Sequence, residues 1–413
     1  MVKINVLAGA ESIGGNFVKI EDEDRTLIFD QGIRFDIIDS YYTPLITPRS
    51  ISELRSLGAL PKSEWYRGVG EIYISHMHLD HLGALSNIPE KTNVHLPSLT
   101  VYESFEEKWR ESPTWLSLIP RKYFINLKEL KPLETDKNDI MAIPVSHSAH
   151  PAYALLYFGK DETILYTGDL RVESFLEEED FIKIKGGIDL FTYLRENKDL
   201  KIDTIIIEGT NIGSSRPPIT PSEATQMIRK LASSHTLSIA TLHPLDVEYA
   251  YFLVKLSAEL GLKSYIASEH LASFLEKLIN RHSRPMVIEE YVSYPTFLEK
   301  ATLGDVEKRS IILVSYREVV DLLRDVASTE PTLLKEAIAV ISEPEPRREE
   351  AVEYHVFANW FLRLGVQHYR IRASGHYYPY ELKSILAKIK PQKVIPIHTE
   401  SPKLFSRILD RLS

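Results

Sequence analysis

The chain has 413 residues, of which 44% are hydrophobic and 26% are charged, and this composition is that of a globular protein with two or three domains. It contains no cysteine, which excludes disulfides, thiolate metal sites and cysteine nucleophiles, so any metal must be bound by His, Asp or Glu. The formal net charge of −9 argues against a protein that coats nucleic acid along its length. It does not exclude a nuclease whose cleft is locally positive.

No segment approaches the roughly 18 consecutive apolar residues that a membrane-spanning helix needs. Residues 1–5 lack the basic start of a secretory signal, and the apolar run at residues 4–7 is too short to be its core. We therefore expect a cytoplasmic protein with no membrane partner.

The first part of the chain alternates short β-rich runs with turns, and residues 2–32 predict an antiparallel meander. Residues 33–70 are rich in aromatic residues and prolines, and we expect them to form an irregular insertion. The aromatic side chains of this insertion could stack on nucleobases or form a hydrophobic flap, and the sequence leaves both open. They are Phe35, Tyr41, Tyr42, Trp65 and Tyr66.

Strands that end in polar residues follow, up to a buried strand that ends at Glu208. After Asn211 a turn-rich linker leads into alternating strands and helices, a pattern typical of a parallel α/β domain. The closing segment predicts a strand, a loop with His376, a helix, and a last strand that ends before His398.

The strongest chemical signal is the run His76-Met77-His78-Leu79-Asp80-His81, which follows an apolar strand. Imidazole and carboxylate ligands suit Zn²⁺, Mn²⁺ or iron. We expect His76 and His78 to bind one metal, and Asp80 and His81 to bind a second about 3.5–4 Å away. Further ligands are expected where other apolar runs end, namely His147, Asp169 as the candidate bridging carboxylate, and His398.

These motifs, which read HMHLDH, SHS, TGD and PIHTE, resemble the metal motifs of the metallo-β-lactamase superfamily in their usual order. The resemblance implies an α/β fold, the αββα metallo-β-lactamase sandwich, that holds two Zn²⁺ ions, with Mn²⁺ as an alternative. It also implies that Asp30, at the end of an early strand, orients a ligand loop, although a simple turn aspartate is the other interpretation.

More than two hundred residues separate Asp169 from His398, and this insertion resembles the β-CASP branch of the superfamily. The closing motifs are most similar to those of RNase J-like ribonucleases of the archaeal type, without a C-terminal domain. The implied domains are a metallo-β-lactamase domain at residues 1–209, an inserted parallel α/β β-CASP domain at residues 210–370, and the return of the first domain at residues 371–413.

The same resemblance implies roles for residues outside the metal set. Glu208 would hold His376, which would act as the general acid on the leaving oxygen. Ser374 and Gly375 would present a hydroxyl and a backbone N–H to a substrate phosphate. Asp80 would serve catalysis as well as metal binding.

The implied function is a zinc-dependent exoribonuclease acting 5′→3′ on single-stranded RNA, in which a hydroxide held between two metals leaves a 5′-phosphate and a 3′-OH. The open alternatives are an endonuclease of RNA processing, a DNA or other metallo-hydrolase of the same fold, and a catalytically silent subunit. Thr399-Glu400 departs from the usual Gly-Glu, and the chain stops fifteen residues after His398. A dimer mediated by a C-terminal domain is therefore in doubt, and another homodimer stays open.

Overall fold

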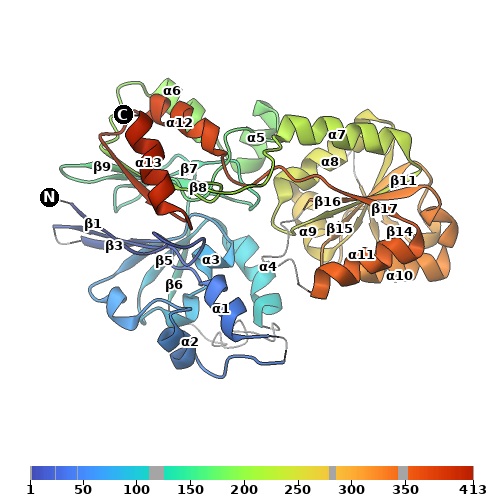
Figure 1. Ribbon diagram of the computed structural model, residues 1–413, viewed down its shortest axis with the longest axis horizontal. Coiled ribbons are helices and arrows are strands. Elements are labelled where there is room, and N and C mark those ends of the chain that lie inside the picture. The colour runs from blue at the N-terminus through green and yellow to red at the C-terminus, as the bar shows by residue number, and fades with distance from the viewer. Residues whose placement is uncertain are drawn as a thin grey trace. The chain divides into compact units, whose positions relative to one another are not determined.

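The computed structural model describes residues 2–23, 25–43, 45–110, 125–278, 285–342 and 352–412 (Figure 1). The chain folds into two compact units. The first unit comprises Met1–Val172, Glu178–Arg216 and Gly375–Ser413, and the second comprises Glu173–Glu177 and Pro217–Ser374. Within the described ranges, no helix is both long enough and apolar enough to cross a membrane.

The first sheet of the first unit has six strands in the order of the chain. Its first three strands are antiparallel, which confirms the predicted meander, and the next three run parallel to their neighbours. The strands are β1 (Lys3–Ala8), β2 (Phe17–Asp22), β3 (Arg25–Phe29), β4 (Glu71–Tyr73), β5 (Asn93–Leu96) and β6 (Asn126–Glu129).

The second sheet of this unit has the order β18-β10-β9-β8-β7, so the last strand of the chain pairs with a strand nearly two hundred residues earlier. This pairing is parallel and sets Ile397 opposite Glu208. The strands are β7 (Ile140–Pro144), β8 (Tyr153–Phe158), β9 (Thr163–Tyr166), β10 (Thr204–Glu208) and β18 (Lys393–Ile397).

The two sheets enclose a common apolar core between their inner faces. Phe29 and Tyr73 of the first sheet pack there with Leu155 and Ile206 of the second. The outer face of the second sheet is covered by α6 (Leu190–Glu196), α12 (Leu382–Ile389) and α13 (Pro402–Leu412). This arrangement confirms the predicted two-sheet sandwich. Further helices of the unit are α3 (Leu79–Leu82), η2 (Leu85–Asn87), α4 (Leu99–Arg110), α5 (Glu178–Lys185) and η8 (Pro379–Glu381).

The prediction that residues 33–70 form an irregular insertion is wrong, because the segment contains α1 (Phe35–Tyr41), α2 (Ile51–Leu57) and η1 (Ser63–Tyr66). The start of α2 is capped by Ser50, whose side chain accepts a hydrogen bond from the backbone of Glu53, and its end is a left-handed Gly58. Such a Ser-x-x-Glu pattern closed by glycine is a helix signal that the proline and aromatic content of the segment concealed.

The second unit contains a seven-stranded sheet in the order β14-β13-β12-β15-β11-β16-β17, in which every pairing is parallel. Its central strands are buried along their whole length, as expected for a parallel sheet with both faces covered. This confirms the predicted parallel α/β domain. The strands are β11 (Leu237–Leu242), β12 (Lys263–Ala267), β13 (Met286–Ile288), β14 (Lys300–Ala301), β15 (Ser310–Ser315), β16 (Ala337–Ile341) and β17 (Gln367–Arg370).

The helices of the second unit alternate with its strands (Figure 1). They are α7 (Pro221–Ser234), α8 (Val247–Glu259), α9 (Glu269–Leu278), η5 (Glu289–Tyr291), η6 (Leu303–Asp305), α10 (Val319–Thr329), η7 (Pro331–Leu334) and α11 (Val352–Leu364).

Candidate metal centre

The candidate ligands of the first unit follow the ends of strands. His76 comes three residues after β4, His147 three after β7, Asp169 three after β9, and His398 directly after β18. Strands β9, β10 and β18 are mutually parallel, so their carboxyl ends meet at one edge of the second sheet. The predicted residues are therefore brought together at one place.

The short helix α3, which carries Asp80 and His81, is held by two loops through backbone hydrogen bonds. The Asp80 carbonyl accepts from the backbone N–H groups of Gly15 and Asn16 at 3.0 and 3.3 Å, and the Gln31 N–H donates to the His81 carbonyl at 2.8 Å. The ligand positions of α3 are thus set by main-chain contacts with the loops after β1 and β3.

One group of ligands consists of His76, His78 and His147. Nδ1 of His78 lies 3.2 Å from Nε2 of His76 and 3.2 Å from Nε2 of His147. Ligand atoms at about 2.1 Å from one tetrahedral cation would be separated by about 3.4 Å, so this spacing fits a shared metal. Burial lowers the pKa of His76 and His147 well below its ordinary value, so both rings are neutral.

The hydrogen bonds of His147 define which of its nitrogens can bind a metal. Its Nδ1 lies 2.6 Å from the Gly375 carbonyl oxygen, which can only accept, so Nδ1 carries the proton. Nε2 of the neutral ring then presents its lone pair toward His78. This is the tautomer that a metal ligand requires.

A second group consists of Asp80, His81 and His398. Oδ2 of Asp80 lies 4.0 Å from Nε2 of His81 and 3.8 Å from Nε2 of His398. Nδ1 of His81 donates to Oδ2 of Asp30 at 2.7 Å, so its Nε2 faces the group. That Nε2 is buried and lies 3.1 Å from Oδ2 of Asp169, so the two atoms are placed to bind one metal.

Oδ2 of Asp169 lies between the two groups. It is 3.8 and 3.9 Å from Nε2 of His76 and His147, and 3.7 and 3.1 Å from Nε2 of His398 and His81. Burial would raise the pKa of Asp169, but the imidazoles of His398 and His81 hold it well below its ordinary value. An ionised oxygen shared by both groups fits a bridging ligand.

Three carboxylates surround His81 in the second group and favour a positive charge there. Burial would lower the pKa of His81, but the carboxylates of Asp169, Asp30 and Asp80 together raise it well above its ordinary value. In the absence of a metal, His81 must therefore hold a proton in a fully buried position. A divalent cation would replace that charge, so the buried clusters are consistent with a binuclear metal site.

Asp30 contacts the ligand His81 from behind the site. Its carboxylate accepts hydrogen bonds from the Ser75 backbone N–H at 2.7 Å, from the Ser75 hydroxyl at 2.8 Å and from the Tyr166 hydroxyl at 2.5 Å. All of these groups are fully buried. The carboxylate therefore ties the ligand His81 to the ends of β4 and β9.

Asn16 and Tyr166, which were not predicted as site residues, form a chain of hydrogen bonds that reaches His398. The Tyr166 hydroxyl donates its hydrogen to Asp30. Toward Asn16 it can therefore only accept, and the Asn16 side-chain NH₂ donates to it at 3.2 Å. The amide oxygen of Asn16 then faces Nδ1 of His398 at 3.1 Å, and the Gly14 backbone N–H points at the same nitrogen at 3.3 Å. These contacts hold the ring so that Nε2 of His398 faces Asp80 and Asp169.

A second cluster borders the metal ligands. Nδ1 of His376 lies 3.0 Å from Oε1 of Glu208, 3.1 Å from the Thr210 hydroxyl and 3.8 Å from Oδ2 of Asp169. The Glu208 carboxylate also accepts from the backbone N–H groups of Leu170 and Thr210. Asp169, Glu208 and His376 lie close enough to form a further group of ligand type, of which only His376 is partly exposed.

The predicted phosphate ligands Ser374 and Gly375 stand at the junction of the units, with Ser374 the last residue of the second. A Cβ on Gly375 would come within 2.4 Å of the Ser148 hydroxyl and 3.0 Å of the His147 ring. Glycine is therefore required for close packing against a candidate ligand. The proposed contacts of both residues with phosphate stay a prediction.

The aromatic side chains of residues 33–70 do not form an exposed platform as a set. Tyr42 and Tyr66 are buried, and Trp65 packs edge-to-face against Phe17 at 5.4 Å. Tyr41 is 58% exposed. Tyr42, Tyr66 and Trp65 therefore pack against other apolar side chains, which is the hydrophobic alternative of the two that the sequence left open.

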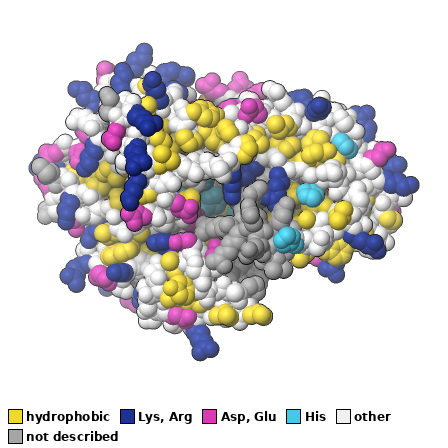
Figure 2. Space-filling view, viewed as in Figure 1, with side chains coloured by type: hydrophobic (Ala, Val, Ile, Leu, Met, Phe, Trp, Pro, Cys, Tyr) yellow, Lys and Arg dark blue, Asp and Glu magenta, His cyan; other side chains and the backbone are white. Residues whose placement is uncertain are grey.

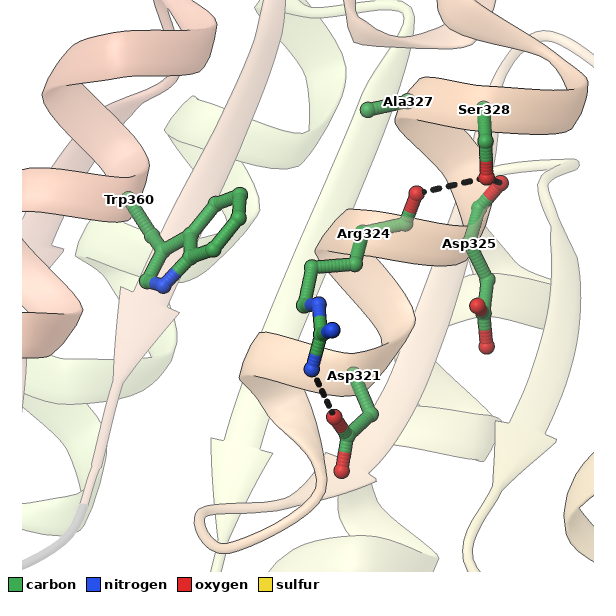
Figure 3. Close-up of a pocket in the computed structure, with 6 residues that line it drawn as sticks. All are labelled: Asp321, Arg324, Asp325, Ala327, Ser328 and Trp360. Carbon is green, nitrogen blue, oxygen red and sulfur yellow. Dashed lines mark hydrogen bonds and ion pairs between the residues drawn. The ribbon is translucent and has the colours of Figure 1, made fainter.

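The second unit carries a cavity of about 590 Å³ beside α10 and α11 (Figure 3). Arg324 lies over the Trp360 ring at 5.9 Å and pairs with Asp321 at 3.2 Å. The other lining residues are Asp325, Ala327 and Ser328. Its lining has two carboxylates and no imidazole, so it does not share the donor set of the metal centre.

Residues 67–210 match the family profile described as the metallo-beta-lactamase superfamily. This range contains six of the seven candidate metal ligands. The seventh candidate ligand, His398, lies outside this range and directly follows β18.

Similarity beyond the superfamily is distant. The chain is 22% identical to Ribonuclease J of Helicobacter pylori over 421 residues, covering 97% of this chain and 56% of that protein. It thus spans about half the length of that relative. It is 22% identical to Ribonuclease J of Methanocaldococcus jannaschii, with 96% and 91% covered, and 35% identical to that of Pyrococcus abyssi over 104 residues, with 25% and 22% covered.

A solved structure of a protein of unknown function from Enterococcus faecalis superposes with a TM-score of 0.71, covering 97% of this chain and 95% of that one. The two sequences are 18% identical, so the likeness extends to the fold alone.

Gly32→Ala should disrupt the metal centre, because a Cβ at Gly32 would lie 1.5 Å from the Asp80 carbonyl oxygen. We expect a loss of at least about 3 kcal/mol in the free energy of unfolding, measured by urea denaturation. Gly70→Ala is the control, since a Cβ there meets nothing within 4 Å, and it should change stability by less than about 0.5 kcal/mol. Equal stability of the two variants would contradict this account.

Asn16→Ala should weaken one metal position selectively, because it removes the side-chain amide that contacts Nδ1 of His398. Loss of such a supporting hydrogen bond lowers metal affinity by about 10–100-fold. Metal per chain, measured by atomic emission after dialysis against limiting Zn²⁺, should fall from near two toward one. Asn5→Ala, which removes a β1 amide that donates to Glu21 on β2, is the control and should keep both metals. Two full sites in Asn16→Ala would refute the role.

Metal release on acidification should occur in two steps. Burial lowers the pKa of His78 to about 4, so protons compete with a metal for the His76–His78–His147 position only near that pH. The raised pKa of His81 means that protons compete there at higher pH. As the pH falls, the Asp80–His81–His398 position should therefore empty first, and the metal content measured by dialysis should show a plateau near one per chain. A single release step near pH 6.5, the ordinary histidine pKa, would contradict this order.

Proposed function

We propose that the chain is a metal-dependent ribonuclease that degrades single-stranded RNA from its 5′ end. The observation that carries the proposal is the His376–Glu208 pair, whose imidazole lies 3.8 Å from the candidate bridging oxygen of Asp169. An acid–base group directly beside a binuclear centre is the equipment that hydrolysis of a phosphodiester needs. The distant full-length similarity to Ribonuclease J proteins supports the choice of RNA.

The seven candidate ligands described above would hold the metals, with Zn²⁺ as our choice and Mn²⁺ as the alternative. When bound, the two cations would supply an activated water and neutralise charge on the phosphate. In the reaction, the oxygen of water bonds to phosphorus as the bond from phosphorus to the 3′-oxygen breaks, which yields a 5′-phosphate and a 3′-OH.

His376 would supply the proton that the leaving 3′-oxygen needs. Because Glu208 is a carboxylate, which accepts, Nδ1 of His376 donates to it and Nε2 is left to exchange a proton with substrate. The Glu208 negative charge stabilises the protonated ring, and Thr210 and Leu170 fix the carboxylate. His376 is also the member of this cluster that solvent reaches, with 13% of its side chain exposed.

The experiment uses RNA labelled at a 5′-monophosphate, incubated with protein and Zn²⁺ or Mn²⁺. We expect labelled mononucleotide from the start of the reaction, and His376→Ala should lower the rate by about 10²–10⁴-fold while retaining both metals. His235→Ala, a histidine at the end of α7 in the second unit, is the matched control and should keep the wild-type rate.

Each alternative has its own outcome in this experiment. Long labelled fragments that precede mononucleotide would show an endonuclease and refute the 5′→3′ direction. No cleavage of RNA by the fully metallated protein would refute the ribonuclease.

A further inference from the structure

The C-terminal part of the first unit has a charge opposite to that of the chain. The chain as a whole has 49 Lys and Arg against 58 Asp and Glu, whereas residues 382–412 have seven against two. Figure 2 shows a column of Lys and Arg side chains over α13, with more of them over α12. A local basic surface on an acidic protein is a feature that counters the net charge where an anion binds.

The basic side chains of α13 form a ridge. Lys403, Arg407 and Arg411 follow one another at intervals of four residues, so they lie along one side of the helix. All three are exposed, and none of them forms an ion pair with another described residue. From the first to the third they span about 12 Å at 1.5 Å per residue, enough to meet successive phosphates.

The apolar side of α13 is largely occupied, with Leu404 and Leu412 its exposed apolar residues. Phe405 is fully buried, and it packs with Ile408 and Leu409 into the core beneath the second sheet. A helix that binds a bilayer needs its apolar face free. The surface left to a partner is therefore the cationic ridge, which fits a polyanion rather than a membrane.

An aromatic pair adjoins this surface on the side of His376. The rings of Tyr378 and Tyr380 are stacked with centroids 5.8 Å apart and planes 13° apart, and Tyr380 is 60% exposed. The pair stands at η8, directly before α12, whose exposed Lys383 and Lys388 continue the basic surface. Exposed aromatic rings beside cations are how proteins bind single-stranded nucleic acid.

Both parts of the surface begin at the candidate site. Tyr378 is two residues after His376, and Lys403 is five residues after His398. We propose that Tyr380 and the cations of α12 and α13 form a binding surface for single-stranded RNA. This surface would bind the bases and phosphates of the strand that lie beyond the scissile bond. The choice of RNA rests on the proposed function, whereas the cationic and aromatic character of the surface does not.

The test measures binding separately from cleavage. A labelled single-stranded RNA is titrated with the full chain in EDTA, and anisotropy gives the affinity at KCl concentrations from about 50 to 200 mM. For the triple variant Lys403→Glu, Arg407→Glu, Arg411→Glu, we expect the affinity to fall by about tenfold or more, and the slope of log affinity against log salt to decrease by about two.

Matched variants separate local contact from net charge. Lys62→Glu, Arg67→Glu, Lys91→Glu makes the same change of charge at exposed positions beside the first sheet and should keep the wild-type affinity. Tyr380→Ala should weaken binding without changing the salt slope, and Tyr380→Phe, which keeps the ring, should restore it. All of these variants should hydrolyse a small phosphodiester, bis(p-nitrophenyl) phosphate, at the wild-type rate.

Several results would overturn the proposal. It fails if the ridge variant and the control variant bind RNA equally well, or if the ridge binds vesicles of phosphatidylglycerol but not RNA. Failure of the proposed function looks different, because the metallated wild type would then cleave no RNA while the ridge variant still showed the loss of binding in EDTA.

Discussion

Carboxylates and imidazoles can be buried together at one site only if positive charge lies among them. Asp169 and Asp30 are almost completely removed from solvent, and an unpaired buried carboxylate is strongly unfavourable. The structure meets this constraint through the imidazoles, which hold the pKa of Asp169 down while the pKa of His81 is driven up. Two divalent cations would supply the same positive charge without a buried extra proton on His81. The clustered imidazole and carboxylate groups are the ligand types that such cations bind.

The pairing of β10 with β18 is the topological counterpart of this constraint. It places Glu208 and Ile397 side by side, so that His398 emerges at the edge where Asp169 already lies. The backbone N–H of His398 then donates to the Gly9 carbonyl at 2.6 Å, which fastens the last ligand to the loop after β1. The centre therefore depends on chain segments from both ends of the sequence.

Some parts of the candidate site can be predicted from the sequence and others cannot. The candidate metal ligands can be predicted because they form one dense motif or follow apolar runs, where imidazole and carboxylate side chains are conspicuous. Asn16 and Tyr166 cannot, because their contacts arise from a chain of hydrogen bonds between the residue before β2, the end of β9 and the residue after β18, and neither residue type is distinctive alone. The helices of residues 33–70 are hard to predict because the segment is rich in prolines and aromatic residues, although Ser50 and Gly58 mark the two ends of α2.

The two halves of the centre are supported by different kinds of contact. His81 and His398 are oriented by side chains, Asp30 and Asn16, that belong to the buried interior of the first unit. His147 is oriented by the backbone carbonyl of Gly375, the residue at which the chain returns from the second unit. His147 is therefore the candidate ligand whose orientation depends on the segment that directly follows the second unit, whereas the supports of His81 and His398 lie elsewhere in the first unit.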